Sequence, residues 1–184
     1  MTTPRRAHES RCQVEIASTT IGCVNFREKL IPWDQLTEWR VTLRQLGKKL
    51  VVTNGCFDLL HLGHVTYLEG ARNLGDALLV GVNSDAAVRE LKGKDRPVNA
   101  EADRAGVVAA LHSVTGVCIF SERTATRFLA AAQPDVYVKG GDYSLETMNQ
   151  EERRRVEEGG GKIIILPIVP DRSTSALLQK IARL

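Results

Sequence analysis

The chain lacks any apolar run near the roughly 20 residues needed to span a bilayer. Its start also lacks a basic stretch followed by an apolar core, which is the pattern of a secretory signal. We therefore expect a cytoplasmic protein without a membrane partner. Its formal net charge is only +3, from 25 Lys and Arg against 22 Asp and Glu. That excess is too small to indicate a nucleic-acid partner unless the basic residues gather on one face. It is equally consistent with a protein that binds small anions.

Cysteine is scarce and scattered along the chain. Cys12, Cys23, Cys56 and Cys118 form no CxxC pair. Neither a disulfide framework nor a zinc ribbon is therefore expected, although the spacing leaves a single bridge between Cys12 and Cys23 open. We expect free thiols in a reducing compartment.

The 184 residues suffice for one compact domain with a short appendage. Residues 1–26 show no sustained apolar period, which predicts a flexible N-terminal extension. In residues 27–48, apolar side chains recur at roughly helical spacing from Pro32 and stop at Gly47, which predicts a lead-in helix. Residues 49–184 would then form the main domain.

Strand-like and helix-like segments alternate through that main domain. Residues 49–53 predict a buried strand, residues 64–74 a helix and residues 77–82 a second strand. The same alternation predicts strands over 114–120, 136–139 and 162–166, with helices over 85–91, 101–112, 124–132, 145–158 and 175–182. This pattern favours an α/β, Rossmann-like fold, with a doubly wound parallel five-stranded sheet and helices on both faces.

The segment after the first expected strand is the natural place for chemistry, because parallel sheets bind ligands beyond the carboxyl ends of their strands. It reads NGCFDLLHLGH over residues 54–64 and contains neither GxGxxG nor a P-loop. His61 and His64 flank Gly63 at a helix start, where free N–H groups favour an anion and imidazoles could stabilise a phosphoryl transition state. The alternatives are a capping or packing role, or a metal held together with Asp58 or Cys56.

Basic residues gather after the second expected strand. Lys92 and Arg96 lie in an expected loop, where mobile cations could neutralise a triphosphate or a sugar phosphate. Arg104, early in the next expected helix, could add a bidentate phosphate contact. Asn83 and Asp85 follow the strand and could orient sugar hydroxyls. The alternatives are a solvated basic loop, a surface arginine and a helix cap at Asp85.

Two further motifs follow later strands. In the run KGGDY over residues 139–143, paired glycines permit a tight turn against a flat base, and Asp142 could accept hydrogen bonds from ribose hydroxyls. A plain turn is the alternative. The run STS over residues 173–175 begins the last expected helix, where hydroxyls and free amides could bind β- and γ-phosphates, or could serve only as an N-cap.

Together these blocks resemble the cytidylyltransferase-like nucleotidyltransferase superfamily, whose HxGH signature matches residues 61–64. Within it the chain looks like the adenylyltransferases that make ADP-heptose from D-glycero-β-D-manno-heptose 1-phosphate. The likeness runs from about Lys49 to the C-terminus through VNSD, LKG, RPVN, KGGDY and STS. It implies an enzyme that takes ATP, accompanied by Mg²⁺, and a sugar 1-phosphate. The alternatives are a glycerol-3-phosphate cytidylyltransferase, an FAD synthetase or a non-catalytic nucleotide-binding module.

The resemblance implies roles for individual residues. Catalysis would fall to His61, His64 and Lys92. The implied nucleotide-binding residues are Gly55, Cys56, Phe57, His61, Gly63, His64, Lys139, Gly140, Gly141, Asp142, Tyr143, Ser173, Thr174 and Ser175. The implied substrate-binding residues are Asp58, Asn83, Asp85, Lys92, Arg96 and Arg104. No resident metal site is expected, and dimers are common in the family, although the sequence leaves the oligomeric state open.

The chain departs from the heptose adenylyltransferases in two places. These enzymes commonly have a glycine a few residues after GGDY, whereas this chain has the polar run 149–155. Within it, EERRR over residues 151–155 is most simply a solvated helix face with i,i+3 and i,i+4 ion pairs. The first 26 residues match nothing in the family. The first departure bears on sugar specificity and the second on the role of the extension.

Overall fold

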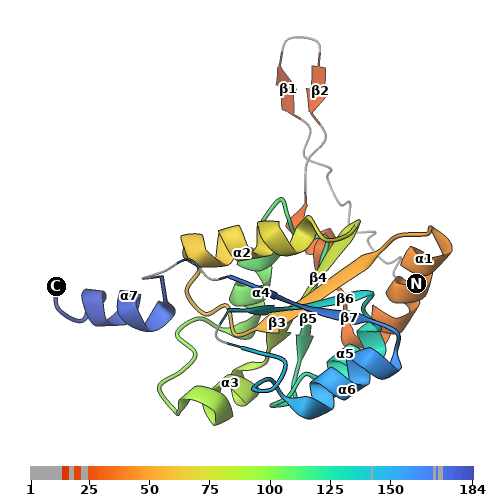
Figure 1. Cartoon of the computed structure of the whole chain (residues 1–184). Helices are drawn as coiled ribbons and strands as arrows, with labels where there is room; N and C mark the ends of the chain where they lie inside the picture. Colours follow the sequence, from red (N-terminus) through yellow and green to blue (C-terminus); the bar gives the residue numbers. More distant parts are fainter. Residues whose placement is uncertain (1–13, 17–18, 22–24, 142, 168, 170–171) are drawn as a thin grey trace, which may run out of the picture.

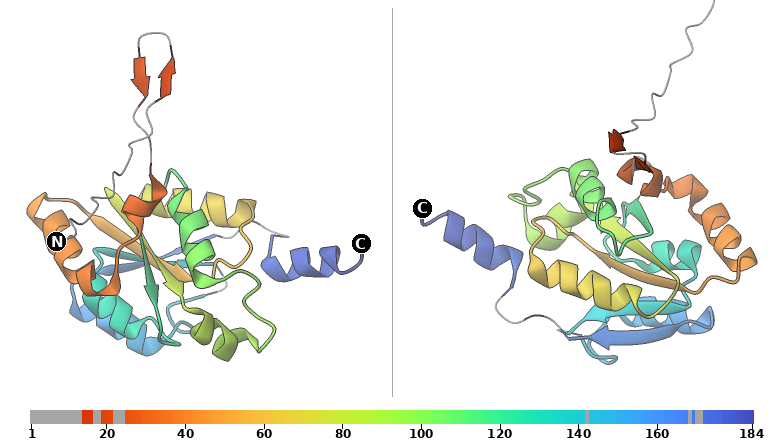
Figure 2. Two further views of the ribbon diagram at one scale, coloured as in Figure 1. Left: turned by 180° about the vertical axis from the view of Figure 1, so that it is seen from behind. Right: turned by 90° about the horizontal axis from the view of Figure 1, so that it is seen from above.

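The computed structural model describes residues 14–16, 19–21, 25–141, 143–167, 169 and 172–184 (Figure 1). Within them, a central parallel sheet lies between two layers of helices, as the views from behind and above also show (Figure 2). None of the helices in these ranges is long and apolar enough to cross a membrane.

The central sheet has five strands in the order β5-β4-β3-β6-β7, all parallel. They are β3 (Leu50–Gly55), β4 (Ala77–Asn83), β5 (Gly116–Phe120), β6 (Val136–Gly140) and β7 (Lys162–Leu166). The predicted doubly wound α/β fold is therefore confirmed. The chain winds from β3 outward to β5 and then returns to the other side of β3. Connections after β3 and β6 consequently diverge, which opens a crevice at the carboxyl ends of these strands.

The strands alternate their side chains between two buried clusters, one on each face of the sheet. Leu50 and Val52 contribute to one cluster, whereas Val51 contributes to the other. The first face is covered by α1 (Leu36–Gln45), α5 (Thr126–Ala132) and α6 (Gln150–Glu158), and the second by α2 (Leu62–Arg72) and α4 (Glu101–Ala109). On the first face Gly81 permits close packing, because a Cβ there would lie 2.6 Å from the Phe128 ring.

Several element boundaries differ from the sequence prediction. Helix α2 begins at Leu62, so Gly63 and His64 both lie in its first turn. Helix α6 begins only at Gln150, because the Asn149 side chain accepts hydrogen bonds from the first free N–H groups and caps the helix. Helix α3 (Asp85–Lys92) and helix α7 (Thr174–Ile181) occur close to their predicted positions.

The predicted lead-in helix is in fact three shorter pieces. Two 3₁₀ segments, η1 (Phe26–Lys29) and η2 (Trp33–Gln35), precede α1. Phe26 packs against the second-face cluster, and Lys29 Nζ donates to the Leu111 carbonyl at 3.0 Å. Phe26 thus lies against the main domain, although we placed it in the extension.

Most of the predicted extension lies outside the described residues, as do Cys12 and Cys23. Two short strands, β1 (Val14–Ile16) and β2 (Thr19–Ile21), form a separate antiparallel pair. Figure 1 draws this pair away from the central sheet. Of the cysteines that the structure describes, Cys56 and Cys118 are free thiols.

Candidate active site

A cavity of about 880 Å³ opens at the carboxyl ends of the strands, beside the β3–β6 switch point. It gathers most of the residues predicted from the sequence: Gly55, Cys56, Phe57, Asp58, His61, Gly63, His64, Asn83, Lys92, Lys139, Gly140, Tyr143, Ser173, Thr174 and Ser175. Gly141, Asp85, Arg96 and Arg104 are not among the lining residues. Asp142 lies outside the described residues.

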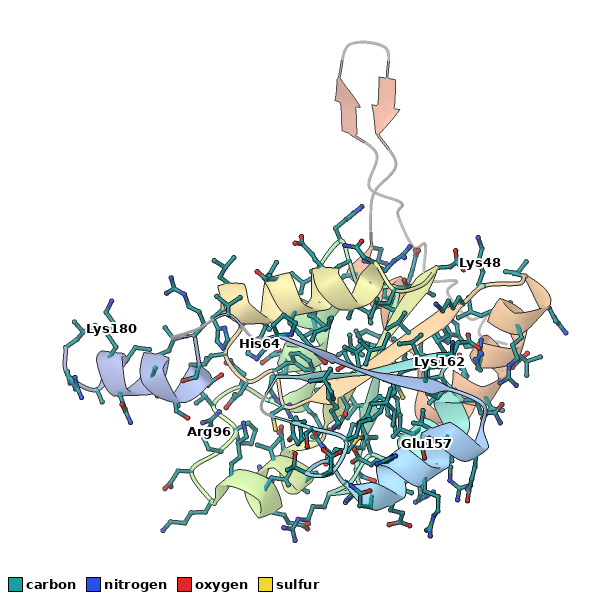
Figure 3. All side chains as sticks on the ribbon, viewed as in Figure 1. Lys48, His64, Arg96, Glu157, Lys162 and Lys180 are labelled. Atoms are coloured by element: carbon teal, nitrogen blue, oxygen red, sulfur yellow. The ribbon has the colours of Figure 1, made fainter. Side chains whose placement is uncertain are left out.

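The two histidines stack against each other at the start of α2. Their ring centroids are 3.9 Å apart, at an interplanar angle of 27°. Each ring has a buried Nδ1 without a hydrogen-bond partner among the described residues. Gly63 permits this stack, because a Cβ at that position would lie 3.0 Å from the His61 ring. Figure 3 shows His64 at the end of α2 nearest α7. Two buried polar atoms without partners indicate a place for a ligand.

Both imidazoles are held in their neutral form. Burial, together with the nearby charges of His61 and Lys92, lowers the pKa of His64 to about 4. Burial and the charge of Arg172 lower the pKa of His61 as well. A neutral imidazole keeps one N–H donor, so near neutral pH each ring can offer a hydrogen bond to a phosphate oxygen.

Phe57 forms one wall beside the histidines. Its backbone has a positive φ of 47°, and its ring lies 5.3 Å from the His64 ring. Gly55 accommodates this ring, because a Cβ on Gly55 would lie 3.0 Å from it. The loop is therefore bent so that an apolar ring shields one side of His64 from water, which contributes to the low pKa of His64.

Three exposed cations line the cavity from different elements. Lys92 ends α3, Arg123 follows β5, and Arg172 precedes α7. Within the described ranges, none of the three side chains has an ion pair or a hydrogen bond to another protein group. We had not predicted Arg123 or Arg172, although each stands beside a strand end or a predicted phosphate motif. Together the cations give this part of the cavity a positive potential that suits a polyphosphate.

Arg96 and Asp58 engage each other, although both were predicted to bind substrate. The buried Asp58 carboxylate accepts hydrogen bonds from Arg96 Nε at 2.7 Å, Val98 N at 2.9 Å and Asn99 N at 3.0 Å. Burial opposes ionisation of Asp58, yet these hydrogen bonds outweigh it and lower the pKa of the carboxyl. In this structure the pair connects the loop after α3 to the loop between β3 and α2.

Arg104 likewise serves the protein's own backbone, in place of the predicted phosphate contact. Its side chain is fully buried. The guanidinium donates to the carbonyls of Asn99, Cys56 and Asn83, and to Asp85 Oδ1 at 2.8 Å. It therefore joins the histidine loop to the end of β4, which positions the cavity wall without facing the cavity.

The end of β6 carries a buried ion pair. Lys139 Nζ lies 3.2 Å from Glu152 Oε2, and it donates to Asn54 Oδ1 at 3.0 Å. The same ammonium lies 5.3 Å from the centre of the Tyr143 ring. The interpretation of residues 151–155 as a solvated face is therefore wrong for Glu152, which is buried. It holds for the outward side of α6, where Arg153 pairs with Glu157.

The start of α7 is partly an N-cap, which is one of the two roles that the sequence predicts. Ser173 Oγ accepts a hydrogen bond from Ala176 N, and Thr174 Oγ1 donates to the Leu59 carbonyl. Ser173, Thr174 and Ser175 also line the cavity. The helix start therefore faces the cavity, where its dipole favours an anion.

Comparison with known proteins agrees with this arrangement. A family model described as cytidylyltransferase-like matches residues 52–178. The chain belongs to the cytidylyltransferase-like family. The matched segment begins in β3 and ends in α7, so it contains every residue that lines the cavity. The predicted membership of the nucleotidyltransferase superfamily is confirmed, and the chain is an enzyme of that class.

Individual relatives within this family are similar over most of the chain. "Bifunctional protein HldE" of Koribacter versatilis is 47% identical over 152 residues, covering 83% of this chain and 31% of that protein. The protein of the same name from Geotalea uraniireducens is 52% identical over 135 residues, covering 73% and 27%. The chain thus spans about a third or less of these relatives.

A solved structure is also similar: the lipopolysaccharide core biosynthesis protein from Thermoplasma volcanium, with 29% identity and a TM-score of 0.56. The match covers 67% of this chain and 98% of that one. The same architecture thus recurs there over nearly the whole of a shorter chain.

The metal interpretation of the histidine pair finds no support in this site. Within the described residues, no group of three or more His, Cys, Asp or Glu side chains gathers that could hold a metal. Asp58, the carboxylate nearest in sequence, is engaged by Arg96 and two backbone N–H groups. The cytidylyltransferase-like site therefore presents imidazoles and cations to its ligand.

Proposed function

We propose that this enzyme transfers AMP from ATP to a sugar 1-phosphate, with release of pyrophosphate. The acceptor that we propose is D-glycero-β-D-manno-heptose 1-phosphate, which gives ADP-heptose. The single observation that carries the proposal is the stacked pair His61–His64, which lines one cavity together with cations that have no partner among the described residues. The KGGDY and RPVN blocks, and the solved relative named for lipopolysaccharide core biosynthesis, support the heptose acceptor.

The proposed reaction is a single in-line displacement. A phosphate oxygen of the acceptor attacks the α-phosphorus of ATP, and the bond from that phosphorus to the pyrophosphate oxygen breaks. Neutral His61 and His64 donate hydrogen bonds to oxygens that gain charge, while Lys92 neutralises the phosphates. No covalent enzyme intermediate is needed, because both substrates are held in reacting geometry.

Magnesium enters this proposal as part of the nucleotide substrate. Mg²⁺ keeps several of its water ligands and would arrive on the phosphates. When bound there, Mg²⁺ supplies further neutralisation of the triphosphate charge.

The free thiols Cys56 and Cys118, together with ATP as a substrate, support a cytoplasmic location.

A pyrophosphate-release screen tests the proposal. ATP and CTP are each combined with heptose 1-phosphate, glycerol 3-phosphate and FMN. Gly140 lines the cavity, and backbone groups beside a base can distinguish adenine from cytosine. We expect heptose 1-phosphate with ATP to be preferred over CTP by roughly ten- to hundredfold in kcat/KM, since a buried polar mismatch costs about 1–3 kcal/mol. Turnover only with CTP, glycerol 3-phosphate or FMN would overturn the assignment.

A further inference from the structure

Four polar side chains meet at the switch point of the sheet, where three of the residues also line the cavity. Lys139 and Tyr137 come from β6, Asn54 from β3 and Glu152 from α6. The Tyr137 hydroxyl lies 2.7 Å from Asn54 Oδ1 and 2.9 Å from Glu152 Oε2. Lys139 Nζ contacts the same two oxygens, at 3.0 and 3.2 Å. Two donors thus share two acceptors in one compact network.

The burial of this network makes its charges interdependent. The side chains of Lys139 and Glu152 are only 10% and 6% exposed. A buried charge without a partner is strongly unfavourable, so each of these groups stabilises the other. An ammonium has three donors, and Asn54 and Glu152 use two of them. The third remains for the cavity, which Lys139 lines.

The other oxygen of Glu152 reaches a different wall of the cavity. Glu152 Oε1 accepts a hydrogen bond from Ala125 N at 2.8 Å. Ala125 directly follows Thr124 and Arg123, which line the cavity after β5. One carboxylate therefore joins α6 to the ends of both β5 and β6. Because both oxygens are engaged by the protein, Glu152 itself is poorly placed to bind substrate.

We propose that Glu152 is a positioning residue for nucleotidyl transfer, whose carboxylate holds the Lys139 ammonium toward the cavity and fixes the Arg123–Ala125 segment beside it. This inference rests on the proposed function, because it takes Lys139 to contact the nucleotide. It gives α6 a role in the site, although its charged run has the pattern of a solvated helix. The Lys139–Glu152 pair itself carries no net charge, which suits the uncharged nucleoside.

The electrostatics around Lys139 lead to a measurable consequence. The groups that face it are Glu152 from α6, Tyr137 on β6, Tyr143 after β6 and the neutral Asn54 on β3. Burial lowers the pKa of Lys139, and Glu152 opposes that shift. Burial, Glu152 and the neighbouring tyrosines raise the pKa of Tyr137, which keeps its hydroxyl protonated. Without the Glu152 charge, the Lys139 ammonium would therefore lose its proton at a lower pH.

The test compares Glu152→Gln with Glu151→Gln, the exposed neighbour on the same helix, by kcat/KM for ATP from about pH 6 to 10. We expect Glu152→Gln to move the alkaline limb to lower pH and to lose on the order of tenfold in kcat/KM near its alkaline end. The Glu151→Gln variant should retain the wild-type profile. Glu152→Asp, which keeps the charge, should retain the position of the limb. An unmoved limb in Glu152→Gln, or an equal displacement in Glu152→Asp, would overturn the proposal.

A double-mutant cycle with Lys139→Gln separates positioning from a general structural role. If Glu152 acts through Lys139, Glu152→Gln should have little further effect on kcat/KM in the Lys139→Gln background, whereas additive losses would contradict the proposal. If Glu152→Gln does not fold, the pH profile of Lys139→Gln is the test. The proposal requires that variant to lack the alkaline limb, so a limb that persists would overturn it.

Calorimetry of ATP binding distinguishes this inference from the proposed function. It is carried out on the wild type, the two single variants Glu152→Gln and Lys139→Gln, and the double variant. If the wild type binds ATP but releases no pyrophosphate with heptose 1-phosphate, the proposed function is refuted. The double-mutant cycle is then calculated from the dissociation constants for ATP. Additivity in those constants would refute the role of Glu152 by itself. A wild type that neither binds nor turns over ATP would overturn both.

Discussion

The two ends of the cavity differ in whether their polar groups have partners within the protein. At the β6–α6 end, Lys139 and Glu152 form a buried pair that also hydrogen-bonds to Asn54 and Tyr137. At the α2–α7 end, the histidine rings have buried nitrogens without partners among the described residues. At the first end the polar groups pair with one another and leave one N–H donor of Lys139 for a ligand. The second end presents imidazoles and the exposed cation Arg172 to the cavity, which suits the phosphates of the proposed nucleotide.

The same division separates the basic residues that the sequence placed around the site. Arg96 and Arg104 each have a carboxylate partner, in Asp58 and Asp85 respectively. Lys92 ends its helix exposed and lines the cavity. Proximity to a strand end therefore does not make a basic residue a phosphate ligand. The presence of a carboxylate within reach decides whether the charge holds the protein together or remains for a substrate.

Replacing a paired arginine should have the largest effect, and that effect should be on stability. Arg104→Ala leaves Asp85 and three carbonyls, of which that of Asn83 is buried, without their donor, so we expect a loss of about 3 kcal/mol in the free energy of unfolding. Arg172→Ala should change this free energy by less than about 0.5 kcal/mol, because Arg172 is exposed. Urea denaturation of both variants checks the contrast, and equal losses would mean that burial does not distinguish the two arginines.

Removing an unpaired imidazole should act on turnover. We expect His64→Ala to lower kcat on the order of 100-fold or more while ATP affinity stays within a few fold, because the ring acts on charge that develops in the transition state. His61→Ala should behave similarly, with some loss of triphosphate binding. Steady-state kinetics and ATP titration measure the two effects separately. Equal losses in ground-state binding and turnover would contradict the transition-state role.

The unpaired lysine should show a smaller loss of the same kind. We expect Lys92→Ala to lower kcat by on the order of tenfold or more, since its ammonium would meet the phosphates as the loop closes. Lys92→Arg should restore little activity, because a planar guanidinium does not reproduce a compact ammonium. Lys94→Ala is the matched control, because Lys94 is exposed in the loop that follows α3, two residues from Lys92, and does not line the cavity. Full activity in Lys92→Ala would show a merely solvated loop.

The parts of this site that are predictable from sequence are those fixed by local backbone. Strand-then-helix alternation places residues 54–64 and 139–143 at one edge of the sheet, and the structure gathers most of them around one cavity. Glu152 escaped prediction because its partners Ala125, Tyr137 and Lys139 all lie outside α6, so the local ion-pair pattern of that helix conceals its burial. Arg104 was misplaced for the same reason, since its four acceptors range from Cys56 to Asn99.

The smallest expected effect is a pH dependence of stability that belongs to the unpaired end alone. The pKa of His64 is about 4 in the folded protein, against an ordinary value of 6.5. Between these values the unfolded chain binds more protons than the folded one, so the free energy of unfolding falls as the pH falls from about 6.5 towards 4. The lowered pKa of His61 acts in the same direction. Above about pH 6.5 neither group contributes a slope.

Melting temperatures of the wild type and His64→Gln across this window measure the effect. We expect the wild type to lose a few °C more than the variant on going from about pH 7 to 4.5, because glutamine has no proton to gain. Asp58 does not contribute to this difference between the two proteins. Its stabilising contribution is lost only as the pH falls below the ordinary pKa of the carboxyl, 3.8. Saturating pyrophosphate should flatten the wild-type curve, because a bound anion favours the imidazolium form and raises its pKa. Parallel curves for the two proteins would mean that the imidazole titrates as it does in water, and the contrast between the two ends of the cavity would not extend to His64.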